Sequence, residues 1–235
     1  MLLSLLIPCW NEEKTLGLLL DNIEEQAFSF DQLEILVIDG GSSDQTRQIA
    51  QNRGVKLVCS EKGRAHQMNA GAKEASGDIL YFVHADSQLP HHFDQKIRKA
   101  IHSDRLAGCF RMQFDRAPWI LQGFAWMSRF NHPICRGGDQ SLFITKSFFE
   151  ELQGFDEAYT IYEDSEFIRR IYKTGKFKVL PATLITSSRK YKNVGWLYLQ
   201  THFGLIHLKY YLGHSPEELA AHYQRHIQAK EDLVI

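Results

Sequence analysis

The sequence predicts an α/β fold in which a mostly parallel central sheet is flanked by helices. Its first 86 residues alternate short apolar runs with amphipathic segments, as repeated strand and helix units do. Strands that alternate with helices through short connections are the pattern of a parallel sheet with right-handed crossovers. A chain of 235 residues with 44% hydrophobic residues can also bury a complete core.

Composition excludes several classes of protein. The chain has 27 Lys and Arg against 28 Asp and Glu, so it lacks the basic excess of a nucleic-acid binder. Its four cysteines form no CxxC pair, which favours reduced thiols in a cytoplasmic protein, with Cys9 and Cys109 in the core. The apolar residues 1–7 have no basic flank and meet Pro8 early, which favours a buried strand over a signal peptide.

Four strands and three helices are predicted in the first part of the chain. Residues 2–7 are apolar on both faces and are expected to end as a strand at Pro8. Asn11 is expected to cap a helix over 12–26 with an apolar inner stripe, and the turn 39–44 leads into a short helix that ends at Gly54. The other predicted elements are strands at 34–38, 55–59 and 78–83 and a helix at 64–75.

The second part is less regular, and no linker or repeat divides it. Its predicted strands are 108–115, 141–145 and 178–180, the last ended by Pro181, and its predicted helices are 119–130, 147–154 and 163–174. A largely apolar helix follows at 196–212, and Ser215 to Glu218 form a capping box that opens another. Polar residues interrupt 196–212, so its apolar surface is expected in the core, a homodimer contact or a peripheral membrane contact.

Three polar or glycine-rich loops follow neighbouring strands of this predicted sheet. They are residues 8–12, 39–41 and 84–86. In parallel sheets, ligands bind at the carboxyl ends of the strands, where these loops meet. Topology alone therefore predicts a nucleotide site here.

Five segments resemble the successive signatures of family 2 glycosyltransferases. They cover about residues 1–190 in the family's order, and the segments are 7–12, 37–46, 62–71, 77–86 and 162–170. The resemblance implies an inverting enzyme with a single GT-A (Rossmann-like) domain over 1–192 and a C-terminal helical extension over 193–235. It also implies a nucleotide-binding part at 1–86 and an acceptor and catalytic part at 87–192. His84-Ala-Asp86, in place of Asp-x-Asp, is similar to a bacterial subgroup with poorly defined acceptors.

The family pattern assigns the nucleotide site residue by residue. Asp39 matches the carboxylate that accepts a hydrogen bond from the base, for which uracil is expected; the alternative is a turn residue bonded to its own backbone. Arg64 matches an arginine beside the diphosphate, with a solvated charged loop as the alternative. The other residues expected at the nucleotide are Pro8, Asn11, Glu12, Gly41, Asn69, Ala85 and Asp86.

The resemblance also assigns a metal and a catalytic base. Asp86 is expected to bind Mg²⁺ or Mn²⁺, which take oxygen ligands from carboxylates and phosphates. His84 departs from the pattern, and metal ligation, donation to phosphate and simple packing all remain open for it. Asp164 matches the base that deprotonates the acceptor hydroxyl, ahead of Glu163 and Glu166. The alternative is that these acids complement a helix dipole.

The remaining expectations concern the sugar and the acceptor. Asp139, Gln140 and Glu163 are expected to contact sugar or acceptor, and Arg189 is a late phosphate contact. The expected partners are a nucleoside-diphosphate sugar and an unidentified acceptor, with peripheral contact at the inner face of the membrane or a homodimer through 196–212. The alternative function is a catalytically weakened protein that binds nucleotide sugars or docks on membranes.

Overall fold

The computed structural model describes residues 1–103 and 105–232, in which seven strands form one sheet. The strand order is β3-β2-β1-β4-β6-β5-β7, and every neighbouring pair is parallel except the two that involve β6. The predicted α/β class with a mostly parallel sheet is therefore confirmed. The strands are β1 (Leu3–Cys9), β2 (Leu33–Asp39), β3 (Lys56–Cys59), β4 (Ile79–Phe82), β5 (Ala107–Phe114), β6 (Leu142–Thr145) and β7 (Phe177–Thr186).

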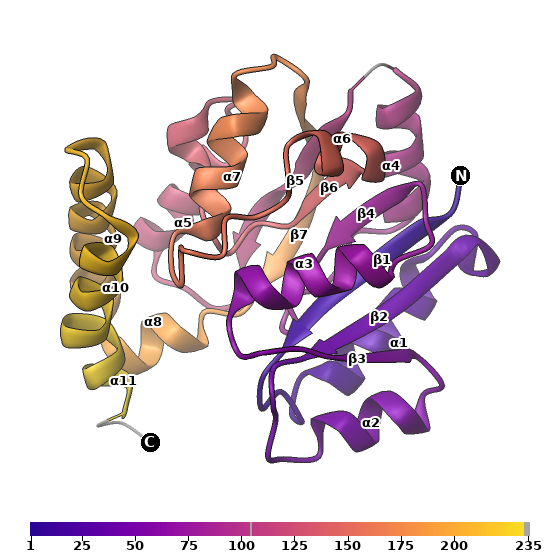
Figure 1. Cartoon of the computed structure of the whole chain (residues 1–235), viewed down its shortest axis with the longest axis horizontal. Coiled ribbons are helices and arrows are strands. Elements are labelled where there is room, and N and C mark those ends of the chain that lie inside the picture. Colours follow the sequence, from indigo (N-terminus) through magenta and orange to yellow (C-terminus); the bar gives the residue numbers. More distant parts are fainter. Residues whose placement is uncertain (104, 233–235) are drawn as a thin grey trace.

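Helices cover both faces of this sheet (Figure 1). One apolar core cluster joins the sheet to α1, α2 and α4, and a second joins the opposite face to α3, α6 and α7. The helices are α1 (Leu16–Gln26), α2 (Thr46–Asn52), α3 (Arg64–Glu74), α4 (Phe93–His102), α5 (Trp119–Met127), α6 (Lys146–Glu151), α7 (Glu163–Tyr172), α8 (Arg189–Val194), α9 (Trp196–Tyr211), α10 (Pro216–Tyr223) and α11 (Ala229–Asp232). Shorter helical turns are η1 (Phe30–Gln32), η2 (Pro133–Cys135) and η3 (Gln224–Gln228).

Two prolines do not end their strands as predicted. β1 continues through Pro8 to Cys9 beside β2, although its pairing with β4 stops at Leu6. The carbonyls of Leu2 and Leu6 accept hydrogen bonds from the β4 side, and the carbonyl of Cys9 accepts one from just beyond β2. Because backbone groups alternate in direction along a strand, the nitrogen of Pro8 faces β4, at a level where the pairing with β4 has ended. No ladder hydrogen bond is lost there.

Pro181 is accommodated differently, in the edge strand β7. The pairing register with β5 shifts so that Phe110 lies opposite Leu180 and Arg111 opposite Thr183. Pro181 and Ala182 therefore form an irregularity in an edge strand, a place where proline is tolerated, and β7 runs on to Thr186.

The predicted helix cap at Asn11 is wrong. The first helix begins only at Leu16, and Asn11 has a φ of 56° with its side chain accepting a hydrogen bond from the Ser43 backbone N–H at 2.9 Å. Asn11 therefore joins the loop after β1 to the loop after β2. Sequence reasoning also missed helices α4 and α8, and the predicted domain boundary at 192 falls inside α8.

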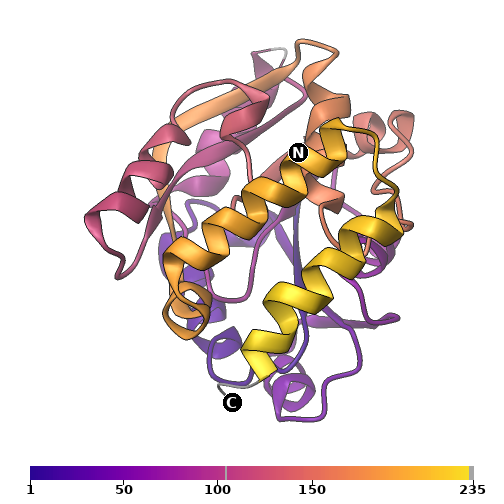
Figure 2. The same ribbon diagram turned by 90° about the vertical axis from the view of Figure 1, so that its left-hand side faces the viewer.

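The C-terminal helices form a layer of their own beside the sheet (Figure 2). A third apolar cluster joins them to α5 and the end of β5, with Phe114, Leu121, Leu199, Ile206 and Leu219 among its buried members. The predicted capping box at the start of α10 is present. Within the described residues, no helix combines the length and apolar character needed to span a bilayer.

Replacing Asp94 with Asn is expected to lower the free energy of unfolding by about 2 kcal/mol. The fully buried Asp94 carboxylate accepts hydrogen bonds from the Phe28 N–H at 2.8 Å, the Ser29 N–H at 3.1 Å and the Arg98 guanidinium at 2.6 Å. An amide would turn an N–H toward at least one of these donors. Denaturant unfolding of the variant measures the loss, and Asp31→Asn, an exposed acid, is the control.

This loss is expected to depend on pH. Burial alone would raise the pKa of Asp94, but its hydrogen bonds outweigh burial and hold the pKa below the ordinary 3.8. A carboxyl whose pKa is lowered by folding stabilises the native state above its unfolded pKa and stops doing so as the pH falls through its folded pKa. The difference between wild type and Asp94→Asn should therefore shrink below about pH 4. A difference that stays constant into strong acid would contradict this account.

Candidate functional site

The strand order reverses between β1 and β4, and this switch point brings two predicted loops together. Glu12 follows β1 and Asp86 follows β4. Burial first, and then the nearby carboxylates of Glu12 and Asp139, raise the pKa of Asp86 to about 6, while Arg189 opposes them. Arg189 Nη2 also lies 3.2 Å from Glu12 Oε1, so these residues form one charged group at the carboxyl edge of the sheet.

Arg64 lies at the centre of a second group next to the first. It begins α3 directly after Gly63, whose φ of 142° strongly favours glycine. Its Nη2 donates to the Gly138 carbonyl and lies 3.0 Å from His84 Nε2. Its Nε is 3.3 Å from Glu163 Oε1, within ion-pair distance but without hydrogen-bond geometry. One guanidinium thus links the segments after β4, before β6 and at the start of α7.

His84 is held as a neutral acceptor. Burial, together with the neighbouring Arg64, lowers the pKa of His84 to about 3, so the imidazole carries no charge near neutral pH. The short contact assigns the lone pair of Nε2 to Arg64, which leaves the proton on Nδ1. The geometry therefore agrees with a role that was not among the three predicted for His84, namely a partner that orients Arg64.

The three acids of α7 have different environments. Glu163 is buried, and burial together with Asp164 raises its pKa while Arg64 opposes the rise. Glu166 is engaged by Arg170, with Nη2 and Oε2 2.7 Å apart. Asp164 is half-buried, and one of its carboxylate oxygens lies against Gly138. Asp164 is therefore the α7 acid best placed to meet a substrate at this edge.

Besides Arg189, which was predicted, α8 and α9 contribute two side chains to the site that were not predicted. Tyr191 of α8 donates to Asp139 Oδ2 at 3.3 Å, and Gln200 of α9 donates to the Tyr191 hydroxyl at 3.3 Å. Burial raises the pKa of Asp139, against the effects of Arg64 and Lys190. Only the folded structure shows that these two side chains support the acidic cluster, which consists of Asp86, Asp139, Glu163 and Asp164.

The residue just before α7 is anchored to the same layer. Tyr162, just before Glu163, has a φ of 71°, unusual for a residue with a large side chain. Its hydroxyl contacts His207 Nδ1 of α9, and its ring lies 4.7 Å from that of Tyr210. Helix α9 therefore helps to fix the start of the helix that carries Asp164.

Asp39 lies at the same edge but its carboxylate is already occupied. It is fully buried and accepts hydrogen bonds from the backbones of Gly41 and Ser42 and from Arg47 Nε at 2.5 Å. Burial opposes ionisation, but these bonds outweigh it and lower the pKa of Asp39. The structure thus agrees with the alternative of a turn residue. Arg47, which the sequence analysis did not consider, is its main charged partner.

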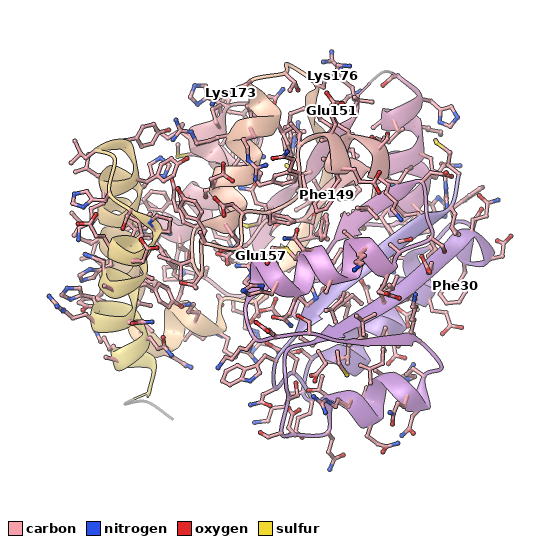
Figure 3. All side chains as sticks on the ribbon, viewed as in Figure 1. Phe30, Phe149, Glu151, Glu157, Lys173 and Lys176 are labelled. Carbon is pink, nitrogen blue, oxygen red and sulfur yellow. The ribbon has the colours of Figure 1, made fainter. Side chains whose placement is uncertain are left out.

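Two further predicted contacts are used for structure instead. The Asn69 amide donates to the Phe155 carbonyl at 2.9 Å and accepts from the Phe155 N–H at 3.0 Å, so it fastens α3 to the loop before α7. The Asn69 amide also donates to Glu157, which Figure 3 shows beside the start of α3. The Gln140 amide is engaged by Arg136 at 2.8 Å and by the Cys135 carbonyl at 2.9 Å. Neither amide is free for a nucleotide or a sugar in this structure.

The remaining nucleotide candidates sit on the loops at this edge. Pro8 is half-buried in β1, Ala85 is buried between His84 and Asp86, and Gly41 has a φ of 90° in the loop after β2. They shape the loops, and none offers a charged group.

The acidic cluster contains one candidate ligand for a divalent cation, Asp86. Asp86 lies among carboxylates that raise its pKa, an environment that a bound cation would relieve. In residues 1–103 and 105–232, no three His, Cys, Asp and Glu side chains are arranged to hold a metal ion. Asp86 therefore fits as a single protein ligand that shares a cation with phosphate oxygens, as Mg²⁺ commonly binds. His222 and His226, joined by His202 with its Nδ1 3.0 Å from His222 Nε2, form no such group either.

Comparison with known proteins settles the family. The profile of the family described as Glycosyl transferase family 2 matches residues 4–151, more than half of the chain. The chain belongs to glycosyl transferase family 2. Family 2 membership agrees with the order of segments along the chain, since the match includes the loops after β1, β2 and β4.

Curated relatives of this family 2 chain are distant and longer. A probable glycosyltransferase of Bacillus subtilis (strain 168), YdaM, is 25% identical over 210 residues, which cover 77% of this chain and 49% of that protein. A dolichol-phosphate mannosyltransferase of Pyrococcus furiosus is 36% identical over 107 residues, 43% of this chain and 30% of that protein. The chain thus spans about half or less of the length of these relatives.

Solved structures show the fold. Staphylococcus aureus TarS 1–349 in complex with UDP has a TM-score of 0.64 at 21% identity, covering 80% of this chain and 60% of that one. The mannosyltransferase PcManGT from Pyrobaculum calidifontis, in complex with GDP-Man and Mn²⁺, has a TM-score of 0.66 at 21% identity, covering 98% of this chain and 69% of that one. The predicted GT-A fold is confirmed.

Proposed function

We propose that this family 2 chain transfers a sugar from a nucleoside-diphosphate sugar to an acceptor hydroxyl, with inversion at the anomeric carbon. The observation that carries the proposal is the convergence on Arg64 of Glu163, Asp164 and Asp139, next to Asp86. Two structural neighbours are in complex with UDP and with GDP-Man, which supports a nucleotide-sugar donor. We propose a UDP-sugar as the donor.

The diphosphate is proposed to bind between Arg64 and Arg189. Arg64 stands at the N-terminus of α3, where backbone N–H groups and the helix dipole favour anions. Arg189 is half-exposed and forms an ion pair with Glu12, so a diphosphate could displace that carboxylate. Asp39 serves by fixing the loop over residues 40–43, and its direct contact with the base stays a prediction.

The transfer itself is proposed to use Asp164 as general base. Its half-exposed carboxylate accepts the proton of the acceptor hydroxyl while that oxygen attacks the anomeric carbon and the bond to the diphosphate breaks. Glu163 holds Arg64 in place, and Asp139, supported by Tyr191, is left to contact sugar or acceptor hydroxyls. The approach of the acceptor opposite the leaving group gives inversion.

A divalent cation, Mg²⁺ or Mn²⁺, would be held by Asp86 and would neutralise charge on the departing diphosphate. PcManGT is in complex with Mn²⁺, which supports a cation in this fold.

Asp86→Ala is expected to weaken UDP affinity roughly tenfold when Mn²⁺ is present and hardly at all in EDTA. The reason is that Asp86 offers the diphosphate no direct attraction and acts through the cation. Calorimetric titration of UDP in both conditions measures the effect. An equal loss of affinity in EDTA would show that Asp86 does not act through a metal.

Nucleoside diphosphate release tests the proposal as a whole. The purified chain, with Mn²⁺, is incubated with UDP- and GDP-sugars, and the free diphosphate is measured over time. Release above the Asp164→Asn background supports transfer or its hydrolytic side reaction. Tight donor binding with no release for any donor and acceptor would favour the alternative, a binding protein with weakened catalysis. A cytoplasmic location and the membrane or homodimer contact through 196–212 stay predictions.

A further inference from the structure

Helix α5 is apolar except for Gln122, yet it buries only one stripe. Leu121 and Ala125 belong to the third core cluster, and Ser128, just after the helix, is also buried, as spacings of four and three predict for one helix face. Trp119 is 82% exposed and Trp126 49% exposed. The exposed large apolar side chains of this helix and the turn after it are Trp119, Phe124, Trp126, Met127, Phe130 and Ile134.

Helix α9 extends this apolar surface. α5 and α9 lie on the same side of the molecule (Figure 2), and both pack on the same buried cluster. The outer side of α9 exposes Leu197, Leu205, Leu208 and Leu212. We call the exposed side of α5 and α9 the α5–α9 face. Many exposed apolar side chains on one side of a protein indicate a docking site.

Charge on the segments that form this face is one-sided. Helix α5 has no charged residue of its own and is flanked by Arg116 and Arg129, and Lys209 is the one Lys or Arg in α9, which contains no acid. The chain as a whole carries a net charge of −1, so its acids are concentrated elsewhere. A partner for these segments is therefore expected to be anionic.

A hollow beside α5 offers a place for an anionic group. It has a volume of about 210 Å³ and lies between α5 and the β5–β7 pair, with Arg111, Gln122, Trp126 and Arg129 among its lining residues. Arg111 Nε is buried and has no hydrogen-bond partner within the described part of the chain. A buried donor without an acceptor is costly, and a phosphate oxygen would satisfy it.

We propose that the α5–α9 face docks on an anionic phospholipid bilayer. Tryptophan and phenylalanine side chains would enter the boundary between headgroups and acyl chains, where aromatic residues are favoured. The basic residues would lie at the level of the headgroups, and the hollow beside Arg111 would take a lipid phosphate. This proposal does not depend on sugar transfer, because none of these side chains belongs to the acidic cluster.

Vesicle co-sedimentation of the full chain tests the proposal. Wild type is expected to bind vesicles that mix phosphatidylcholine with phosphatidylglycerol, and to bind pure phosphatidylcholine far less. The double variant Trp119→Ala, Phe124→Ala should lose roughly tenfold or more in partition, because apolar burial drives interfacial binding. Phe30→Ala is the matched control: Phe30 is 47% exposed, as Phe124 is, but it lies on the opposite side from α9 (Figure 3).

Several outcomes would overturn the proposal. These are no binding to the mixed vesicles, equal binding to neutral vesicles, or a double variant that binds as wild type does. Light scattering distinguishes a second copy of the chain as the occupant: a dimer that the double variant converts to a monomer would assign the α5–α9 face to self-association. Both substituted side chains are exposed, so unchanged thermal unfolding of the double variant is expected.

Discussion

Replacing Asp164 with Asn is expected to slow sugar transfer about a thousandfold while leaving the affinity for UDP within roughly twofold. Asparagine has nearly the same size and keeps an oxygen that can accept from the Ser165 N–H, so the start of α7 should retain its shape. It cannot take a proton from the acceptor hydroxyl. Initial rates under saturating donor give the loss in turnover, and calorimetric titration gives the affinity.

Glu166→Gln is the control for this experiment. It removes a neighbouring carboxylate of the same helix, which pairs with Arg170 in an i,i+4 arrangement. The variant should be less stable, but transfer should slow by no more than about twofold. If Glu166→Gln abolished transfer and Asp164→Asn did not, the assignment of the base would be wrong.

Gly138→Ala is expected to lower turnover about a hundredfold with little effect on folding. A Cβ at this position would lie 2.3 Å from Asp164 Oδ2 and 3.2 Å from Arg64 Nη1. The carboxylate must therefore move by about an ångström, and misplacements of that size in a catalytic group cost around a hundredfold. Gly138 lies in a loop outside the regular elements, so the chain should fold normally.

The neighbouring glycine provides a closely matched control. A Cβ on Gly137 would meet no atom within 4 Å, and neither glycine has the positive φ that would strain an alanine. Gly137→Ala should keep wild-type turnover. If both variants behaved alike, contact with Asp164 would not be the cause of the loss.

The sheet could be predicted from the sequence because its signals are local. Apolar runs such as 34–38 and 78–83 identify buried strands without knowledge of their neighbours. The two prolines misled the prediction because their effect depends on pairing. Pro8 is tolerated only since β4 has stopped pairing at that point, and Pro181 only since β7 is an edge strand. Strand neighbours of this kind cannot be deduced from a local window.

The candidate site could be predicted only in part from the sequence, for a similar reason. The positions of Asp86 and Arg64 follow from strand ends and helix starts, which local patterns locate. The hydrogen-bond partners of each side chain, however, are residues that lie far away in the sequence. The Asn69 amide is used by Phe155, and Asp139 is supported by Tyr191, partners that lie 86 and 52 residues away. The sequence could not show that these contacts form.

A thermal unfolding screen against nucleotide sugars tests the central claim most directly, namely that this acidic and arginine-containing edge binds a sugar diphosphate. A ligand that binds only the native state raises the unfolding temperature by mass action. The account predicts a rise with at least one nucleoside-diphosphate sugar in the presence of Mn²⁺, and a smaller rise for the Arg64→Ala variant. No shift with any nucleotide sugar, with or without Mn²⁺, would contradict it.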